Sequence, residues 1–147
     1  MAEMIEYSDR TDDLSVEMLK GFFRGWPHHP DPETHLKILK QSAFCWTARE
    51  GERCVGFINA VSDGVFYAAI SLLEVLPAYQ GRGIGRELLR LMLENLREMY
   101  AVDLVCDEKL VRFYEKAGLQ RHCAMVLRRY ENQDGRAEYA DRAGPEK

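Results

Sequence analysis

The sequence predicts an α+β fold in which a mixed, mostly antiparallel sheet is flanked by helices on both faces. Three observations predict it. Apolar runs of strand length, separated by turn residues, recur between residues 44 and 76. A glycine-rich stretch follows at residues 80–85, and a strong amphipathic helical pattern begins directly after it. A short apolar strand comes after that helix, which implies a parallel crossover added to antiparallel strands.

The N-terminal part is expected to hold a short strand, two helices and a loop. Residues 3–8 fit the strand, and apolar residues at helical spacing favour a helix over residues 12–21. Pro27 and Pro30 stand on both sides of the histidine pair and make residues 26–30 a loop. The second helix is expected at residues 31–41, because it opens with Asp-Pro-Glu, which supplies a cap, a first-turn proline and an acid.

The middle of the chain is expected to form an antiparallel meander of three strands. The runs at residues 44–49, 54–61 and 65–76 have strand composition, and Pro77 stops the third. Beyond the glycine-rich stretch, the pattern predicts an amphipathic helix over residues 85–100.

The C-terminal part is expected to begin with a short strand at residues 102–106. A second short helix follows at residues 110–117, and Gly118 is its expected C-terminal cap. A last strand is expected at residues 119–129. The remaining residues, 131–147, form a polar tail that is expected to be loose or lightly docked.

Composition indicates one globular domain. A chain of 147 residues buries about 68–70% of its unfolded surface and needs no metal or disulfide to hold a core. The net charge of −4 argues against a nucleic-acid partner, which usually meets a basic surface, and suits a cationic acceptor. The first residues lack the regions of a signal peptide, and no apolar run reaches about 18 residues. A cytoplasmic protein without a membrane partner is therefore expected.

The cysteines are expected to be free thiols in a reducing compartment. No two of them have C-x-x-C spacing, and the four histidines do not fall at ligand spacing with them, so no metal is expected. The four cysteines are Cys45, Cys54, Cys106 and Cys123.

The glycine-rich stretch has the composition of an anion-binding loop. Gly81, Gly83 and Gly85 alternate between a strand and a helix, which permits a tight backbone path and leaves the first helical N–H groups unpaired. The helix N-terminus carries about half a positive charge, so these N–H groups suit phosphates. Arg82 and Arg86 add positive charge at the rim.

Several loop types can be compared with this stretch. A Walker loop needs Gly-Lys-Ser/Thr, which is absent, and a dinucleotide fingerprint read from Gly81 needs a glycine where Arg86 stands. The pattern that fits is Gln/Arg-x-x-Gly-x-Gly/Ala. A glycine-rich turn without a ligand is the alternative.

Two blocks resemble the GNAT superfamily of acyltransferases. Residues 73–85, LEVLPAYQGRGIG, resemble the family's strand and pyrophosphate loop. Residues 107–119, DEKLVRFYEKAGL, resemble the block Asn-x₆-Tyr-Glu-x-x-Gly-Phe. The similarity is strongest over residues 43–119. The resemblance implies a GNAT-like N-acyltransferase domain over residues 1–130, followed by the polar tail.

The resemblance also implies roles for particular residues. The main chain at Val75 would pair with the pantetheine arm of coenzyme A, and its N–H would polarise the thioester carbonyl. Tyr114 matches the tyrosine that protonates the departing thiolate; core packing is the alternative for it. Asp107 stands where the family often has an asparagine that touches pantetheine, and an acid there also suits capping of the next helix. The residues whose main-chain N–H groups would bind the pyrophosphate are Gln80, Gly81, Arg82, Gly83, Ile84, Gly85 and Arg86.

Acyl transfer to an amine also requires a proton acceptor. A free amine of pKa about 10.4 is almost fully protonated at neutral pH. Glu74 interrupts an apolar run, and strand alternation puts it on the face opposite Leu73 and Val75, so it is the candidate base. A solvent-facing or structurally paired carboxylate is the alternative. His28 and His29 lie in an aromatic-rich loop that either lines the acceptor pocket or is an ordinary loop.

The function expected from the resemblance is transfer of an acetyl or other short acyl group from acetyl-CoA to a primary amine. The acceptor stays open among a small metabolite, an antibiotic amine and a protein amine. A non-catalytic acyl-CoA sensor and an interaction protein that keeps only the fold are the alternatives. The final hairpin of the family looks short here, which leaves one wall of the acceptor site undefined. The loop around Trp26 and the polar tail are candidates for acceptor contacts or for contacts within a homodimer.

Overall fold

The structure, a computed structural model, describes residues 4–136 and contains one five-stranded sheet in the order β1-β2-β3-β4-β5. Neighbouring strands are antiparallel except β4 and β5, which are parallel. The expected mixed, mostly antiparallel sheet is confirmed. The strands are β1 (Ile5–Ser8), β2 (Phe44–Glu50), β3 (Arg53–Ser62), β4 (Tyr67–Val75) and β5 (Ala101–Asp103).

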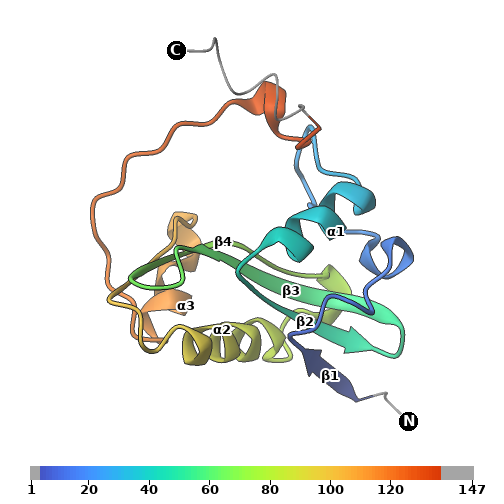
Figure 1. The fold of residues 1–147 in the computed structure, drawn as a ribbon, viewed down its shortest axis with the longest axis horizontal. Coiled ribbons are helices and arrows are strands. Elements are labelled where there is room, and N and C mark those ends of the chain that lie inside the picture. The colour runs from blue at the N-terminus through green and yellow to red at the C-terminus, as the bar shows by residue number, and fades with distance from the viewer. Residues whose placement is uncertain (1–3, 137–147) are drawn as a thin grey trace.

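Helices cover both faces of the sheet (Figure 1). The α-helices are α1 (Pro32–Gln41), α2 (Ile84–Asn95) and α3 (Val111–Glu115), and the 3-10 helices are η1 (Val16–Leu19), η2 (Pro77–Tyr79), η3 (Glu108–Leu110) and η4 (Tyr130–Asn132). None of the helices between residues 4 and 136 has the length and apolar character needed to cross a bilayer.

Helix α1 begins as its sequence predicts. The Asp31 carboxylate accepts a hydrogen bond from the Thr34 N–H at 2.8 Å, and Pro32 occupies the first helical position, where it has no N–H to leave unpaired. The helix ends at Gln41, as expected.

Helix α2 lies on the opposite face and packs against β2, β3 and β4. Its apolar stripe of Ile84, Leu88, Leu89 and Met92 is buried. A Cβ added at Gly56 on β3 would lie 3.2 Å from Leu88 and 3.3 Å from Ile84, so this glycine allows the helix to approach the sheet closely.

Several expected elements differ from the structure. The amphipathic helix expected over residues 85–100 ends five residues earlier, at Asn95. The helix expected over residues 12–21 is only the single 3-10 turn η1, because Lys20 is extended and Gly21 has a φ of +95° that ends the turn. The helix expected over residues 110–117 is divided between η3 and α3. The strand expected over residues 102–106 is cut to the three residues of β5.

The strand expected over residues 119–129 is absent from the structure. Residues 120–129, here called the arm, are extended and exposed, and they belong to the long connection between α3 and η4 (Figure 1). Their composition favours a strand, but a strand also needs a neighbour for its ladder, and no strand within residues 4–136 pairs with them.

The chain after the arm returns to the N-terminal loop. The Gln133 side chain accepts a hydrogen bond from the His28 N–H at 3.2 Å, and Arg136 forms an ion pair with Asp31 at 3.0 Å. The described beginning of the polar tail is therefore docked; its residues 137–147 lie outside the described residues. The domain boundary at residue 130 stays a prediction.

The two cysteines on the sheet are buried, and burial raises the pKa of Cys45 and Cys54 to about 12. Such thiols are poor nucleophiles at neutral pH, because little thiolate is present. Cys106 is half-buried and Cys123 is exposed, and all four are free.

His35 on α1 is the unusual polar residue of the core. Its ring is 1% exposed, and neither ring nitrogen has a hydrogen-bond partner among the described residues. The ring packs against Phe22, Phe23 and Phe57 at centroid distances of 5.4, 4.9 and 4.3 Å. Burial in this aromatic cluster lowers the pKa of His35 to about 4.

Protonation of His35 is therefore expected to oppose folding. The unfolded ring, with a pKa of about 6.5, binds its proton before the folded one does, so stability is complete above pH 6.5 and falls as the pH drops towards 4. The shift corresponds to about 3 kcal/mol. Urea unfolding at several pH values should show this loss in the wild type and a much flatter profile in His35→Leu. The exposed His28→Leu should keep the wild-type slope; equal slopes in wild type and His35→Leu would contradict the prediction.

Candidate active site

The strands β4 and β5 pair over only three residues. Tyr67, Ala68 and Ala69 lie opposite residues 101–103, whereas β3 accompanies β4 as far as Val75. Beyond residue 69 the outer edge of β4 therefore faces no strand of the described part of the chain, and its backbone groups are available to a ligand. An extended ligand with amide groups can pair with such an edge as a strand would.

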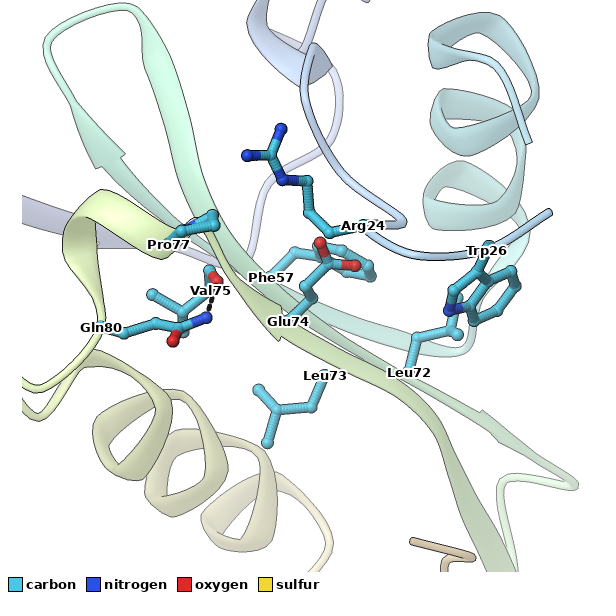
Figure 2. Close-up of a pocket in the computed structure, with 9 residues that line it drawn as sticks. All are labelled: Arg24, Trp26, Phe57, Leu72, Leu73, Glu74, Val75, Pro77 and Gln80. Carbon is cyan, nitrogen blue, oxygen red and sulfur yellow. Dashed lines mark hydrogen bonds between the residues drawn. The ribbon is translucent and has the colours of Figure 1, made fainter. Parts of the chain in front are cut away.

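The last residue of β4 turns its polar groups towards this open edge. The Leu76 N–H donates to the Val55 carbonyl of β3 at 2.9 Å, and successive residues of a strand point their N–H groups to opposite edges. The Val75 N–H and carbonyl therefore face outward, and the carbonyl accepts from the Gln80 side chain at 3.0 Å (Figure 2). The role that the family resemblance implies for the Val75 N–H stays a prediction.

The glycine-rich loop connects the end of β4, where the open edge lies, to the start of α2. Gly81 and Gly83 have φ values of +79° and +83°, which L side chains rarely adopt. Gly83 is the N-cap residue, so no side chain caps the helix, and the first helical bond runs from the Glu87 N–H to the Gly83 carbonyl. The N–H groups of the first turn are left for an anion.

The space in front of these N–H groups, here called the cradle, is left open by the surrounding side chains and has positive charge beside it. A Cβ added at Gly81 would have nothing within 4 Å, and one at Gly83 would meet only the Arg86 guanidinium, at 3.5 Å. The Arg82 guanidinium lies 5.1 Å from the centre of the Tyr79 ring, a cation–π contact that holds it beside the loop. A pyrophosphate fits these residues.

The cradle is joined to the second sequence block through Gly85. A Cβ added there would lie 3.7 Å from Val75 and 3.8 Å from Phe113, so the helix start packs between β4 and α3. Phe113 in turn contacts Tyr114 edge to face at 5.0 Å. The two blocks are therefore neighbours in space.

Glu74 lines a small cavity of about 280 Å³ on the other side of β4. Figure 2 shows its carboxylate directed towards the loop that carries Arg24, whereas Leu73 leaves the opposite side of the strand. The cavity is lined by Arg24, Trp26, Phe57, Leu72, Leu73, Glu74, Val75, Pro77 and Gln80.

The Glu74 carboxylate holds the N-terminal loop in place. Both of its oxygens accept from the Phe23 N–H, at 2.9 and 3.0 Å, and Phe23 has a φ of +63°, a strained value for an aromatic residue. Desolvation raises the pKa of Glu74 above its ordinary value, although the Phe23 N–H and the Arg24 charge act in the opposite direction. Structural pairing, one of the two interpretations open from the sequence, is therefore observed, and a role as base stays a prediction.

Tyr114 lies in a different cavity. It is buried on α3 and lines a groove of about 960 Å³ beside β5, and burial raises its pKa to about 12. The two cavities share no lining residue, so Glu74 and Tyr114 are not brought together. Asp107 occupies the N-cap position of η3, but its side chain makes no capping hydrogen bond there, so this capping prediction is wrong.

The loop before α1 supplies lining residues to the Glu74 cavity, but they are not the two histidines that the sequence singled out. Trp26 and Arg24 line the Glu74 cavity, whereas His28 and His29 do not. The His29 ring instead lies 2.9 Å from the Pro30 carbonyl. The aromatic composition of the loop was the only sequence signal for Trp26, and nothing in the sequence singled out Arg24 or the Phe23 N–H.

An open strand edge that continues into an uncapped helix N-terminus defines a site for an extended, phosphate-bearing ligand. The model of the Acetyltransferase (GNAT) family matches residues 11–119. The chain therefore belongs to the GNAT acetyltransferase family, and the resemblance found in its two sequence blocks is confirmed.

Solved structures agree with this assignment. A proposed acetyltransferase from Deinococcus radiodurans R1 is 44% identical, with a TM-score of 0.88 over 91% of this chain and 94% of that chain. The GNAT family protein SP0256 from Streptococcus pneumoniae TIGR4 is 29% identical, with a TM-score of 0.71 over 86% of this chain and 98% of that chain. The expected fold class is confirmed by both.

Curated relatives are longer than this chain. The Glycine max protein Probable acetyltransferase TAP2 is 34% identical over 110 residues, which are 66% of this chain and 44% of that protein. The Arabidopsis thaliana protein GCN5-related N-acetyltransferase 1, chloroplastic, is 26% identical over 113 residues, 74% of this chain and 57% of that protein. The chain spans about half the length of the curated relatives it matches.

The contact between Glu74 and Phe23 predicts a difference between two substitutions. Glu74→Ala leaves the Phe23 N–H without its acceptor in a strained turn and should lower the free energy of unfolding by about 2 kcal/mol. Glu74→Gln keeps an acceptor oxygen in place and should cost less than half of that. Urea denaturation measures both; equal losses for the two variants would show that the hydrogen bond does not hold the loop.

Proposed function

We propose that the protein is an N-acetyltransferase that moves an acetyl group from acetyl-CoA to a primary amine. The observation that carries this proposal is the continuity between the open edge of β4 and the uncapped start of α2. An extended amide-containing arm and a pyrophosphate are joined in coenzyme A in the same order as these two features. The cytoplasm remains the proposed location, although the name of one relative places that protein in the chloroplast.

The donor would be held mainly by backbone groups. The main-chain N–H groups of residues 80–86 would bind the pyrophosphate, assisted by the charges of Arg82 and Arg86. The outward N–H of Val75 would donate to the thioester carbonyl, where an oxyanion develops during attack. Bound acetyl-CoA supplies the acetyl group as an activated thioester.

The acceptor amine must lose a proton before or during attack. A primary amine of pKa about 10.4 is almost fully protonated at neutral pH, so a nearby base lowers the barrier. Glu74 is the proposed base, because its carboxylate lines the cavity beside Val75 and burial raises its pKa towards a value useful for this role. Its hydrogen bonds with the Phe23 N–H fix the carboxylate in one orientation.

Tyr114 is proposed to stabilise the departing thiolate. With a pKa of about 12 the phenol is fully protonated at neutral pH, so its O–H is a ready donor. A thiol has a pKa of about 8.5, so complete proton transfer from this phenol would be uphill by about 5 kcal/mol. A hydrogen bond from Tyr114 to the sulfur therefore fits the environment better than full protonation by this side chain.

Donor binding is tested most directly at Gly81. The variant Gly81→Asp places a carboxylate in the cradle and should weaken acetyl-CoA binding at least a hundredfold in calorimetric titration. Gly64→Asp is a matched control, because Gly64 has the same φ of +79° and nothing within 4 Å of an added Cβ, but it lies in the turn at the other end of β4. The control should bind as the wild type does.

Either part of this comparison can contradict the proposal. Unchanged binding by Gly81→Asp, or no binding by the wild type, would remove the donor site. Binding by the wild type without thiol release over a broad panel of amines would leave an acyl-CoA-binding protein rather than an enzyme.

The role of Glu74 as base predicts a change in the pH profile of thiol release. The carboxylate accepts a proton only when it is ionised, so activity in the wild type should be lost as the pH falls through the raised pKa of Glu74. Glu74→Gln should lower kcat/KM at least a hundredfold and remove this limb, while the ionisation of the amine still contributes. The exposed Glu98→Gln should leave the profile unchanged; a Glu74→Gln profile of wild-type shape would assign the base to another group.

A further inference from the structure

A tight turn places two side chains beside the Glu74 cavity. The Trp26 N–H donates to the Phe23 carbonyl at 3.3 Å and closes a turn over residues 23–26, in which Gly25 has a φ of +82°. A positive φ at the third position is typical of a type II turn. The Phe23 ring also packs against the Trp26 ring at a centroid distance of 5.0 Å. The two residues between which the chain reverses are thus held together, and Arg24 and Trp26 both line the cavity.

The cavity has one charged side chain of each sign. Among its lining residues only Arg24 and Glu74 are charged. Both oxygens of Glu74 accept from the Phe23 N–H, and within residues 4–136 the Arg24 guanidinium forms neither an ion pair nor a hydrogen bond. An arginine is charged at every pH at which the protein is folded. An anionic group that enters the cavity would therefore supply the partner that Arg24 lacks.

The charged groups and the apolar wall of the cavity are arranged in a definite order. Figure 2 shows the Arg24 guanidinium and the Trp26 ring on opposite sides of the Glu74 carboxylate. Phe57 and Leu72 extend the apolar wall on which Trp26 lies. A carboxylate has about four lone-pair sites, so Glu74 retains acceptor capacity beyond its hydrogen bonds with Phe23. The cavity thus offers an acceptor for an ammonium group between a donor for a carboxylate and an apolar surface.

We propose that the acceptor is a small α-amino acid with an apolar side chain. Its ammonium group would pair with Glu74, its carboxylate with Arg24, and its side chain would pack on Trp26. In such a molecule one carbon carries the amine, the carboxylate and the side chain, so the amine lies between the other two groups as Glu74 lies between Arg24 and Trp26. A lysine side chain of a protein has no carboxylate beside its amine and would leave Arg24 without a partner.

The size of the cavity agrees with a small acceptor. Its volume of about 280 Å³ is slightly below the range of roughly 300–1,000 Å³ that is typical of pockets for drug-sized ligands. An amino acid fits within such a space, whereas a larger acceptor would have to leave most of its surface outside.

This inference rests on the proposed function, because it names the acceptor class of the same site. The ammonium group would give one proton to Glu74, and the free amine would attack the thioester carbonyl. An N–C bond forms, and the C–S bond breaks with its electron pair leaving on sulfur. The second nitrogen proton then balances the thiolate as a free thiol, and the proton on Glu74 returns to solvent. The products are an N-acetyl amino acid and coenzyme A. Arg24 takes no part in these steps and determines specificity.

The test compares three ligands that differ in one substituent on the carbon beside the amine. L-Phenylalanine has a carboxylate there, L-phenylalaninamide a neutral amide, and phenethylamine a hydrogen. Each is titrated calorimetrically into the protein saturated with coenzyme A, so that no acetyl transfer occurs. L-Phenylalanine should bind at least tenfold more tightly than the other two, because a hydrogen bond between charged groups is stronger than a neutral one. Arg24→Gln should weaken binding of L-phenylalanine at least tenfold and that of phenethylamine by less than about twofold.

Two further variants and a second readout separate charge from a general effect. Arg24→Lys keeps the positive charge and should restore part of the preference for L-phenylalanine. Arg53→Gln is the matched control, since Arg53 is also exposed but lies on β3 and lines neither cavity, and it should bind all three ligands as the wild type does. In thiol release from acetyl-CoA, the loss in Arg24→Gln should appear in KM for L-phenylalanine and not in kcat, because the carboxylate is unchanged by the reaction.

Four results would overturn the assignment of Arg24. They are no binding of L-phenylalanine by the wild type, equal binding of the three ligands, an unchanged order of affinities in Arg24→Gln, and equal losses in Arg24→Gln and Arg53→Gln. Failure of the proposed function would look different: L-phenylalanine would bind with the expected preference, but no thiol would be released from acetyl-CoA. Thiol release with phenethylamine and no preference for L-phenylalanine would keep the proposed function and remove this inference.

Discussion

The short contact between β4 and β5 is the constraint on which the site depends. Three residue pairs hold the two strands together at one end, and the strands then diverge. If the parallel ladder continued to Val75, the outer N–H and carbonyl groups of β4 would be used up and the glycine loop would begin beside a closed sheet. An open edge inside a sheet is normally a liability. Here it is tolerated because a polar ligand of strand-like shape can cover it, and because α2 buries the adjacent face independently of β5.

A second constraint acts on Glu74, whose carboxylate both holds a loop in place and has a pKa raised by its burial. It accepts the N–H of Phe23, which lies 51 residues away in sequence, and so fixes a strained turn at the mouth of the cavity. The same burial that makes this hydrogen bond valuable also raises the pKa of Glu74. A group in this position is preorganised, because the loop and the carboxylate hold each other. The aromatic cluster beneath the loop, with His35 and Phe57, gives the turn a rigid base.

How far the sequence determines these features differs from element to element. The start of α1 and the glycine-capped start of α2 were predictable, because caps, prolines and glycines act within a few residues. The helix predicted over residues 12–21 was too long, since only the turn η1 forms there. The apolar spacing of this segment reflects its burial and not a continuous helix. The arm has strand composition, but pairing is decided by neighbours that the local sequence does not specify. The hydrogen bond between Glu74 and the Phe23 N–H could not be predicted for the same reason. A backbone N–H carries no sequence signature, and its position follows from the fold of a distant loop.

The separation of Glu74 and Tyr114 into two cavities follows from what the proposed reaction requires. One group must accept a proton from the amine while the other donates to the sulfur. A carboxylate and a phenol in direct contact would hydrogen-bond to each other and satisfy neither need. Glu74 is directed to one face of β4 (Figure 2), whereas Tyr114 lines the groove beside β5. The two cavities differ in size: the Glu74 cavity has a volume of about 280 Å³ and the Tyr114 groove one of about 960 Å³. Water in that groove would weaken a hydrogen bond from Tyr114, because a high dielectric screens it.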